Sequence, residues 1–344
     1  MNVPTNTQPQ PVLADHWLQW MAENRLRGCT PESMVETMVA AGLDRALCTQ
    51  AIPMLEADPV YKAAVRHQQL LRKLESVVAN QQKLWEMRPG YGMVEKRAGV
   101  SRDELFERYI CGSRPLVLTD IAADWPAMRR WSAAALKARF GHVDIEIQAE
   151  RNADPRYEEN KLQHRHVVRL ADFVDRVLAG GPTNDYYMTA NNEALRRPEF
   201  APLLDDIGTL PPICDRAELP RLSSFWFGPA GTNTPLHHDT LMLFHTQVVG
   251  RKRWRFISPL ETPKLYNFNN VFSPIDIDRP DLARYPLFSQ VTVLEVIAEP
   301  GDTVFLPLGW WHQVSSLDVS LSFSYSNLAV PNHYSFQNPD IHDW

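Results

Sequence analysis

Gly228-Pro-Ala-Gly-Thr-Asn-Thr-Pro-Leu-His-His-Asp239 is the most informative stretch of this 344-residue chain. Two histidines and an aspartate follow a segment rich in Gly, Pro and Asn, which is typical of a turn. On an extended strand, residues two apart point to the same face. His237 and Asp239 can therefore converge on one point, while His238 faces away.

His312 is the strongest candidate to complete this pair. It follows an expected strand and turn over 301–307, in the string Gly309-Trp-Trp-His312. Two neutral imidazoles and one carboxylate leave three positions open on a metal, which suits Fe(II) that binds a cosubstrate and O2. His-x-Asp alone is a weak signal, because the chain has 11 histidines. We expect Trp310 and Trp311 to pack beside the ligand.

The next strand, Gly250-Arg-Lys-Arg-Trp-Arg-Phe256, separates two sets of side chains by alternation. One set is Arg251, Arg253 and Arg255, and the other is Lys252, Trp254 and Phe256. We expect a solvated, basic face and an apolar inward face with one lysine. An inward lysine is costly unless it meets an anion. Two anions remain open: the distal carboxylate of a small dicarboxylic acid, or a protein carboxylate at the barrel rim.

Short strands separated by Pro, Gly and Asn dominate the chain from about residue 186. This texture predicts a sandwich or barrel, in a mainly β fold with α, and not a parallel βαβ sheet. The expected strands are 186–189, 223–227, 241–249, 252–257, 291–297, 303–306 and 319–325.

The first quarter of the chain differs from the rest in its helical pattern. Residues 1–12 predict a flexible tail, and 13–88 predict helices, one of which starts at the capping pair Thr30-Pro31. Arg88-Pro-Gly-Tyr-Gly92 breaks the last helix, so we place a domain boundary there and a second domain over 93–335.

The last of these helices, expected over 59–87, would be about 40 Å long. Two sets of positions recur in it every seven residues: Val60, His67, Leu74 and Gln81, and Ala64, Leu71, Val78 and Trp85. Such a helix can pair with a second copy, dock a substrate, or lie along the following domain. The last is the simplest, although burying His67 and Gln81 would be costly.

Composition narrows the classes of function. Apolar residues make up 44% of the chain, which fits a globular protein. The 35 Lys and Arg against 41 Asp and Glu give a net charge of −6, so we do not expect nucleic acid as a partner. The four cysteines form no metal-binding or disulfide pattern. No stretch resembles a membrane span or a signal peptide, which predicts a cytoplasmic protein.

Several motifs together resemble the JmjC or cupin-like Fe(II)/2-oxoglutarate oxygenases, and most closely the protein-hydroxylase branch that includes factor inhibiting HIF. They are Trp226 to Asp239, Gln247 to Lys252, Ser258-Pro259, Asp278 to Pro286, Pro300 to Asp302, Leu306 to His312, Arg114 to Thr119 and Asp124-Trp-Pro126. The resemblance covers about residues 98–330. It implies a double-stranded β-helix, a jelly-roll of the cupin type, behind the helical N-terminal region.

The resemblance also implies roles for single residues. His237, Asp239 and His312 would bind iron and form the catalytic centre. Lys252 would bind the C5 carboxylate of 2-oxoglutarate with support from Thr234. Tyr187 resembles a family tyrosine that holds the same carboxylate, and its neighbour Tyr186 is a competing alignment.

Two positions depart from the family pattern. Leu243 and Ser322 stand where the protein hydroxylases usually carry asparagines beside the cosubstrate. This difference predicts an altered arrangement around the C1 carboxylate or the oxygen position. His245 shares the inward parity of His237 and offers a polar contact there; a plain core histidine is the other interpretation.

The function implied is an Fe(II)- and 2-oxoglutarate-dependent dioxygenase that uses O2 to hydroxylate a protein or peptide side chain. Two alternatives stay open. One is a hydroxylase of a small molecule or biosynthetic peptide intermediate, because Leu243 and Ser322 loosen the resemblance. The other is a catalytically inactive metal-binding cupin that acts as a binding module, against which the intact triad and Lys252 argue. A homodimer through the long helix is a further expectation.

Overall fold

The computed structural model describes residues 13–190, 192–267 and 270–333, so the expected tail at 1–12 lies outside the described residues. The described residues form two compact units that divide between Gln81 and Gln82. The division falls inside the last N-terminal helix, a few residues before the helix ends. None of the described helices combines the length and apolar character that crossing a bilayer requires.

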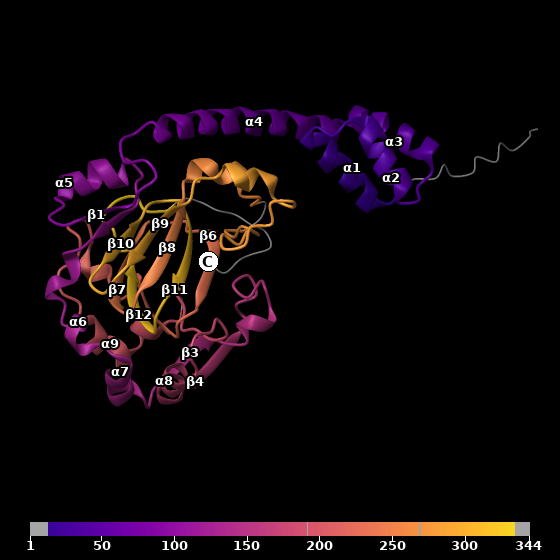
Figure 1. Ribbon diagram of the computed structural model, residues 1–344. Helices are drawn as coiled ribbons and strands as arrows, with labels where there is room; N and C mark the ends of the chain where they lie inside the picture. The colour runs from indigo at the N-terminus through magenta and orange to yellow at the C-terminus, as the bar shows by residue number, and fades with distance from the viewer. Residues whose placement is uncertain (1–12, 191, 268–269, 334–344) are drawn as a thin grey trace, which may run out of the picture. The chain divides into compact units, whose positions relative to one another are not determined.

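The first unit is helical (Figure 1). It contains α1 (Asp15–Arg27), α2 (Pro31–Ala40), α3 (Arg45–Ala57) and most of α4 (Pro59–Glu86). The side chain of Thr30 accepts a hydrogen bond from the Ser33 amide and caps α2, as the sequence predicts. The core of α1 to α3 is small and rich in sulfur, with Met21, Met34, Met38 and Cys48 fully buried.

Two mainly antiparallel sheets form the centre of the second unit. In spatial order the first sheet holds β1 (Glu95–Arg97), β2 (Leu116–Leu118), β10 (Thr303–Leu306), β7 (Leu243–Val249), β12 (Ser320–Tyr325) and β5 (Ser223–Gly228). The second holds β6 (Asn233–His238), β11 (Trp311–Ser316), β8 (Lys252–Ile257) and β9 (Leu294–Ala298). Only the β1–β2 pair is parallel among these strands. The predicted fold class, a jelly-roll core with an N-terminal helical region, is confirmed.

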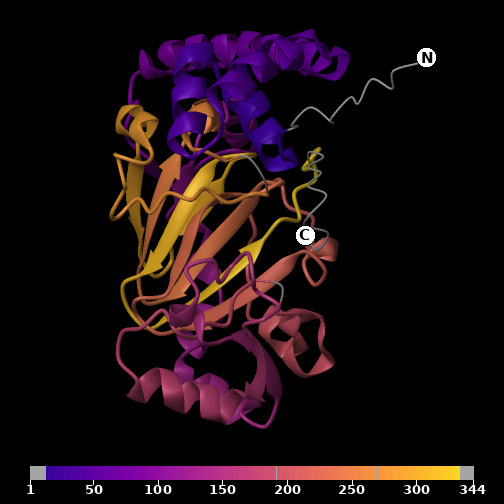
Figure 2. The ribbon, with the colours of Figure 1, turned by 90° about the vertical axis from the view of Figure 1, so that its right-hand side faces the viewer.

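Helices and a third small sheet cover one end of the barrel (Figures 1 and 2). β3 (Asp144–Gln148) and β4 (Arg165–Arg169) pair antiparallel next to α7 (Ala133–Phe140) and α8 (Leu170–Ala179). The shorter elements are α5 (Arg102–Glu104), the π-helix η1 (Leu105–Ile110), α6 (Ala127–Arg130) and α9 (Ala201–Leu204), with 3-10 turns η2 (Ile121–Asp124), η3 (Arg151–Ala153), η4 (Ala194–Arg196), η5 (Pro198–Phe200), η6 (Arg216–Glu218), η7 (Pro259–Lys264) and η8 (Pro286–Gln290).

The expected strand 186–189 is absent from this arrangement. Tyr187 bridges Gln148 on β3, and Met188 bridges Phe227 on β5. The segment changes its partner at consecutive residues and forms no continuous ladder. β11 was not among the expected strands, because Trp311–Ser316 has no alternation of apolar and polar residues.

The expectation of a solvated outer face on β8 is wrong for Arg255. This residue is 5% exposed, and its guanidinium contacts Asp278 at 2.6 Å. Arg253 donates to the same carboxylate at 2.9 Å, and Arg251 pairs with Asp318. The reason is tertiary: the loop that carries Asp278 covers this face of the strand. The three arginines are therefore fixed by carboxylates of this chain.

Candidate metal centre

Two neighbouring strands bring the predicted histidines together. β6 and β11 pair antiparallel, and their register places His237 directly opposite His312. The two ring centroids lie 4.0 Å apart. Asp239 follows β6 immediately, on the same side as His237. One ligand atom from each of the three residues lies within 4.8 Å of the others, which is close enough to hold one metal ion.

Backbone carbonyls fix the orientation of both imidazoles. Nδ1 of His237 lies 2.8 Å from the Pro235 carbonyl, and Nδ1 of His312 lies 3.1 Å from the Trp310 carbonyl. A carbonyl can only accept, so each Nδ1 carries the proton and each Nε2 keeps its lone pair. Hydrogen bonds of this kind set the tautomer of metal-binding histidines.

The electrostatics of the triad suit a cation. Burial, helped by the nearby His237, lowers the pKa of His312 well below its ordinary value, so this imidazole is neutral. Loss of water around Asp239 raises the pKa of its carboxyl, and His237 opposes the rise. A bound cation would favour the ionised carboxylate, because it supplies the charge that the dehydrated site lacks.

His238 lies on the other face of β6. Its ring packs edge-on against Trp311 with centroids 4.6 Å apart, and burial lowers its pKa to about 4. Trp311 is 1% exposed and belongs to a cluster behind the second sheet. Trp310 is equally buried on the inner side, where it packs against Trp85 at the end of α4. Both tryptophans are therefore packing residues.

Lys252 ends inside the barrel, as alternation along β8 predicts. It is 1% exposed, and its Nζ donates to the Tyr187 hydroxyl and to Ser322 Oγ, each at 2.9 Å. Burial lowers the pKa of Lys252 to about 7. Among the described residues, no carboxylate lies within ion-pairing distance of this Nζ. The rim carboxylate considered from sequence is therefore not its partner, and the cavity offers a place for an anion.

Of the two adjacent tyrosines, Tyr187 is the one at the cavity. Its ring also lies 5.6 Å from Lys252 Nζ, and burial raises the pKa of its hydroxyl. Tyr186 points the other way, donates to the Arg176 carbonyl at 3.1 Å and packs against Phe173. Of the two residues that the sequence left as alternatives, the structure thus places Tyr187 beside Lys252 and Tyr186 away from it.

Thr234 reaches the cavity through an irregularity in β6. It is three residues from His237, and strict alternation would place it on the opposite face. The pairing with β11 shifts between His312 and Val314, so β6 carries one extra residue there. This bulge returns Thr234 to the face of His237, and both residues line the same cavity.

The two positions that depart from the family pattern have different surroundings. Leu243 lines the cavity and packs against the apolar cluster that contains Trp254. Ser322 accepts the hydrogen bond from Lys252. His245 also lines the cavity; it is 3% exposed, and its Nε2 has no hydrogen-bond partner among the described atoms. Burial and the neighbouring Lys252 lower its pKa well below the ordinary value, so the ring is neutral.

The cavity that joins the triad to Lys252 has a volume of about 680 Å³. Its inner walls are aromatic, with Trp226 and Trp254 near Lys252. The exposed charged residues Glu193, Arg196 and Arg221 line its outer part. A cavity of this size and lining is typical of a small-molecule or side-chain binding site.

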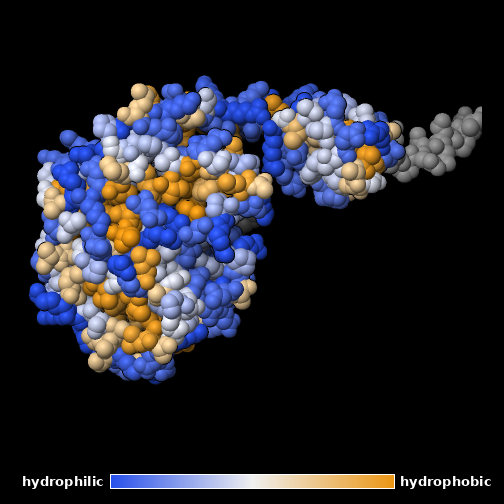
Figure 3. Space-filling view, viewed as in Figure 1, coloured by the Kyte–Doolittle hydropathy of each residue, from blue (hydrophilic) through white to orange (hydrophobic). Residues whose placement is uncertain are grey.

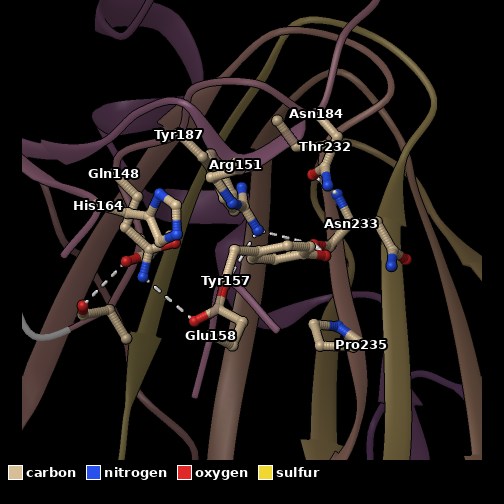
Figure 4. A network of polar contacts seen from close by, with 12 residues as sticks. Gln148, Arg151, Tyr157, Glu158, His164, Asn184, Tyr187, Thr232, Asn233 and Pro235 are labelled. Atoms are coloured by element: carbon tan, nitrogen blue, oxygen red, sulfur yellow. Dashed lines mark hydrogen bonds and ion pairs between the residues drawn. The ribbon is translucent and has the colours of Figure 1, made fainter. Parts of the chain in front are cut away.

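A polar network supports the wall behind Tyr187 (Figure 4). The Arg151 side chain is fully buried, and its Nη2 donates to Glu158 Oε1 at 3.0 Å and to the Asn233 carbonyl at 2.8 Å. The guanidinium carbon lies 4.2 Å from the Tyr157 ring centroid and 5.4 Å from that of Tyr187. The network therefore ties the start of β6 to the tyrosine that contacts Lys252.

Sequence reasoning missed this network and the aromatic walls. Residues 149–164 show no strand or helix period. A charged segment without such a period predicts a solvent-exposed loop, and not a buried network. Trp226 was part of a recognised motif, but its neighbours Phe225 and Phe227 are apolar too, so alternation alone does not show which face is inward.

The sequence is similar to a known domain family and to several known proteins. Residues 102–338 match the family profile described as "Cupin-like domain". "Lysine-specific demethylase 8" of Xenopus tropicalis is 30% identical over 232 residues, which cover 65% of this chain and 50% of the relative.

Two further relatives have similar sequence identity and coverage. "Lysine-specific demethylase JMJ30" of Arabidopsis thaliana is 31% identical over 251 residues, covering 67% of this chain and 54% of the relative. "Jumonji C domain-containing protein 5" of Drosophila melanogaster is 28% identical over 237 residues, covering 65% and 57%. The chain thus spans about half the length of the curated relatives it matches.

Proposed function

The chain belongs to the cupin-like, JmjC-related domain family, and from this premise we propose that it is an Fe(II)- and 2-oxoglutarate-dependent dioxygenase that hydroxylates a protein or peptide side chain. The observation that carries the proposal is a buried, unneutralised lysine in the same cavity as a His-Asp-His triad. A metal site alone would fit many cupins. A cation placed to bind the far end of a dicarboxylate is a more specific feature.

His237, Asp239 and His312 would hold the iron. Their Nε2 lone pairs and the carboxylate converge, and the protonated Nδ1 atoms are already bonded to carbonyls. When bound, Fe(II) supplies the oxidative chemistry, in which O2 and 2-oxoglutarate give succinate, CO2 and one oxygen atom for a substrate C–H bond. The remaining residues orient the reactants and limit access of water.

Lys252 would bind the C5 carboxylate of 2-oxoglutarate through a charge-assisted hydrogen bond. The hydroxyls of Tyr187 and Ser322 already hold its Nζ at 2.9 Å, so this nitrogen is positioned before the ligand arrives. Thr234, on the same face through the β6 bulge, adds a hydroxyl. His245 also lines the cavity, and its Nε2, which has no partner among the described atoms, would offer a further polar contact to the cosubstrate.

The substrate would enter from the charged mouth of the cavity. A volume of about 680 Å³ leaves room beyond a small diacid for a side chain. The names of the relatives, lysine-specific demethylases, favour a protein substrate for this chain as well. Removal of an N-methyl group also begins with oxidation of a C–H bond, so the same site would serve either outcome.

The decisive experiment measures succinate formed from 2-oxoglutarate by the purified chain with Fe(II) and ascorbate. We expect slow turnover without substrate and none in Asp239→Ala, because this variant loses the only charged ligand. Asp318→Ala, which removes an exposed carboxylate on a turn, should behave as wild type. Equal turnover in wild type and Asp239→Ala would contradict the oxygenase assignment.

Mass spectrometry on candidate peptides then separates the activities. Hydroxylation adds the mass of one oxygen, whereas demethylation removes the mass of one methylene. Oxidation of a free metabolite but of no peptide would favour the small-molecule alternative. Binding of Mn(II) and 2-oxoglutarate without any turnover would favour the binding module.

A further inference from the structure

Helix α4 carries an unusual share of the exposed apolar side chains. The described residues include 17 large hydrophobics that are well exposed, and six of them lie on this one helix: Val60, Leu70, Leu71, Leu74, Val77 and Leu84. The visible face of the second unit also shows apolar patches among hydrophilic residues (Figure 3). Scattered patches are ordinary on a protein surface, so the periodicity on α4 is the more informative feature.

Five of the six exposed large apolar residues of α4 follow a regular heptad. Eight positions on one side of the helix are separated alternately by three and by four residues. We call this set the seam: Val60, Ala63, His67, Leu70, Leu74, Val77, Gln81 and Leu84. Seven of these eight positions are exposed, and Ala63 is half-buried. The seam runs over four heptads, about 40 Å of helix, which reaches the length that a two-stranded coiled coil requires.

The contacts that α4 makes in each unit leave the seam uncovered. In the first unit, Arg72 donates to the Leu26 carbonyl at 2.8 Å from the side of the helix opposite the seam. In the second unit, Gln82 donates to Glu261 at 3.2 Å, and Trp85 packs edge-on against Trp310. Trp85 belongs to the second seven-residue column seen in the sequence. That column flanks the seam, and most of it is half-buried.

We propose that the seam pairs with the seam of a second copy of this chain, forming a parallel two-stranded coiled coil. Its polar member Gln81 favours an identical partner in parallel register. In that register Gln81 faces Gln81, so each amide can donate to and accept from its counterpart, while His67, whose Nδ1 lies 2.9 Å from the Ala63 carbonyl of its own helix, faces His67. In the antiparallel register Gln81 would face Ala63, which leaves its amide without a partner.

The flanks of the seam agree with the parallel register. There, Arg66 of one copy faces Leu71 of the other, and Lys73 faces Val78. The aliphatic stems of the basic residues can cover these apolar side chains while the charges stay in water. In the antiparallel register Lys73 would face Lys73, and like charges would repel.

Two adjacent leucines of similar exposure test the proposal in the full-length chain. Leu70, on the seam, is 55% exposed, and Leu71, on its flank, is 48% exposed. We expect wild type to be a dimer in sedimentation equilibrium, and Leu70→Glu to raise its dissociation constant by at least about a hundredfold. Leu71→Glu should keep or tighten the dimer, because the introduced carboxylate would face Arg66 of the other copy.

Each other outcome overturns the proposal. A wild type that stays monomeric at all concentrations, including one that binds only a different protein, excludes the self-pairing. Dissociation by both substitutions indicates the antiparallel register, in which Leu71 faces Leu71. A dimer that survives Leu70→Glu uses another surface. Circular dichroism checks that both variants keep wild-type helix content, as substitutions at exposed positions should.

Discussion

Two buried basic side chains lie near the Tyr187 ring, and among the described residues only one of them pairs with a carboxylate. The guanidinium of Arg151 lies 5.4 Å from the tyrosine ring and pairs with Glu158 in the cavity wall. The ammonium of Lys252 lies 5.6 Å from the same ring and, among the described residues, has only hydroxyl partners. We infer that Arg151 stabilises the fold through its ion pair, whereas Lys252 is available to bind an anionic ligand.

The largest effect on stability should come from replacing Arg151, which lies in the cavity wall. Arg151→Ala leaves Glu158, whose side chain is 13% exposed, without its countercharge, and removes the link to the Asn233 carbonyl. Breaking a buried ion pair costs roughly 3–5 kcal/mol of stability. Urea unfolding followed by tryptophan fluorescence measures this loss. A change below about 1 kcal/mol would show that the pair is dispensable and remove the contrast with Lys252.

Lys252→Met should weaken the binding of 2-oxoglutarate without lowering the stability of the protein. Without a ligand the variant should be as stable as wild type or more so, because it removes a buried charge with no carboxylate partner. Its affinity for 2-oxoglutarate should fall about 10- to 150-fold, through loss of a charge-assisted hydrogen bond worth roughly 1.5–3 kcal/mol. Calorimetric titration with Mn(II) in place of iron measures this affinity.

Arg251→Ala and Arg253→Ala are matched controls on the same strand. Both residues are partly exposed and pair with Asp318 and Asp278 on the outer face. Each should change the affinity for 2-oxoglutarate little, because partly exposed ion pairs contribute weakly. If either weakened binding more than Lys252→Met, the inward anion site would be assigned to the wrong face of β8.

The last effect is a dependence of binding on pH. Burial lowers the pKa of Lys252 from 10.5 to about 7. Between these values the unfolded chain binds more protons than the folded one, so ligand-free stability gains from a rise in pH across this window. A bound carboxylate requires the charged lysine, so binding should take up a proton above pH 7. The affinity should then fall by up to about tenfold per pH unit.

Lys252→Arg provides the control for this slope, because a guanidinium stays charged across the same range. Its affinity for 2-oxoglutarate should be nearly independent of pH between about 7 and 9, even if its absolute value is lower. Proton uptake can be measured by calorimetry in buffers of different ionisation enthalpy. A wild-type affinity that is flat with pH would mean that Lys252 is already charged before the ligand binds.

Several site residues could be located from local patterns, and others could not. Alternation along β8 placed Lys252 inward, and spacing by two placed His237 and Asp239 together. The same rule puts Thr234 on the wrong face, because a bulge in β6 adds one residue to the count. The rule also misses the burial of Arg255, since a distant loop supplies Asp278.

By itself, the sequence determined the features that repeat at short range. The heptads of α4, the capping pair Thr30-Pro31 and the inward parity of Lys252 depend on dihedral periods that any short segment carries. Only the tertiary structure decided which distant segments meet: His312 opposite His237, and Tyr187 in place of Tyr186 at the cavity. Such contacts depend on strand register and on the packing of the whole core, which no local period encodes.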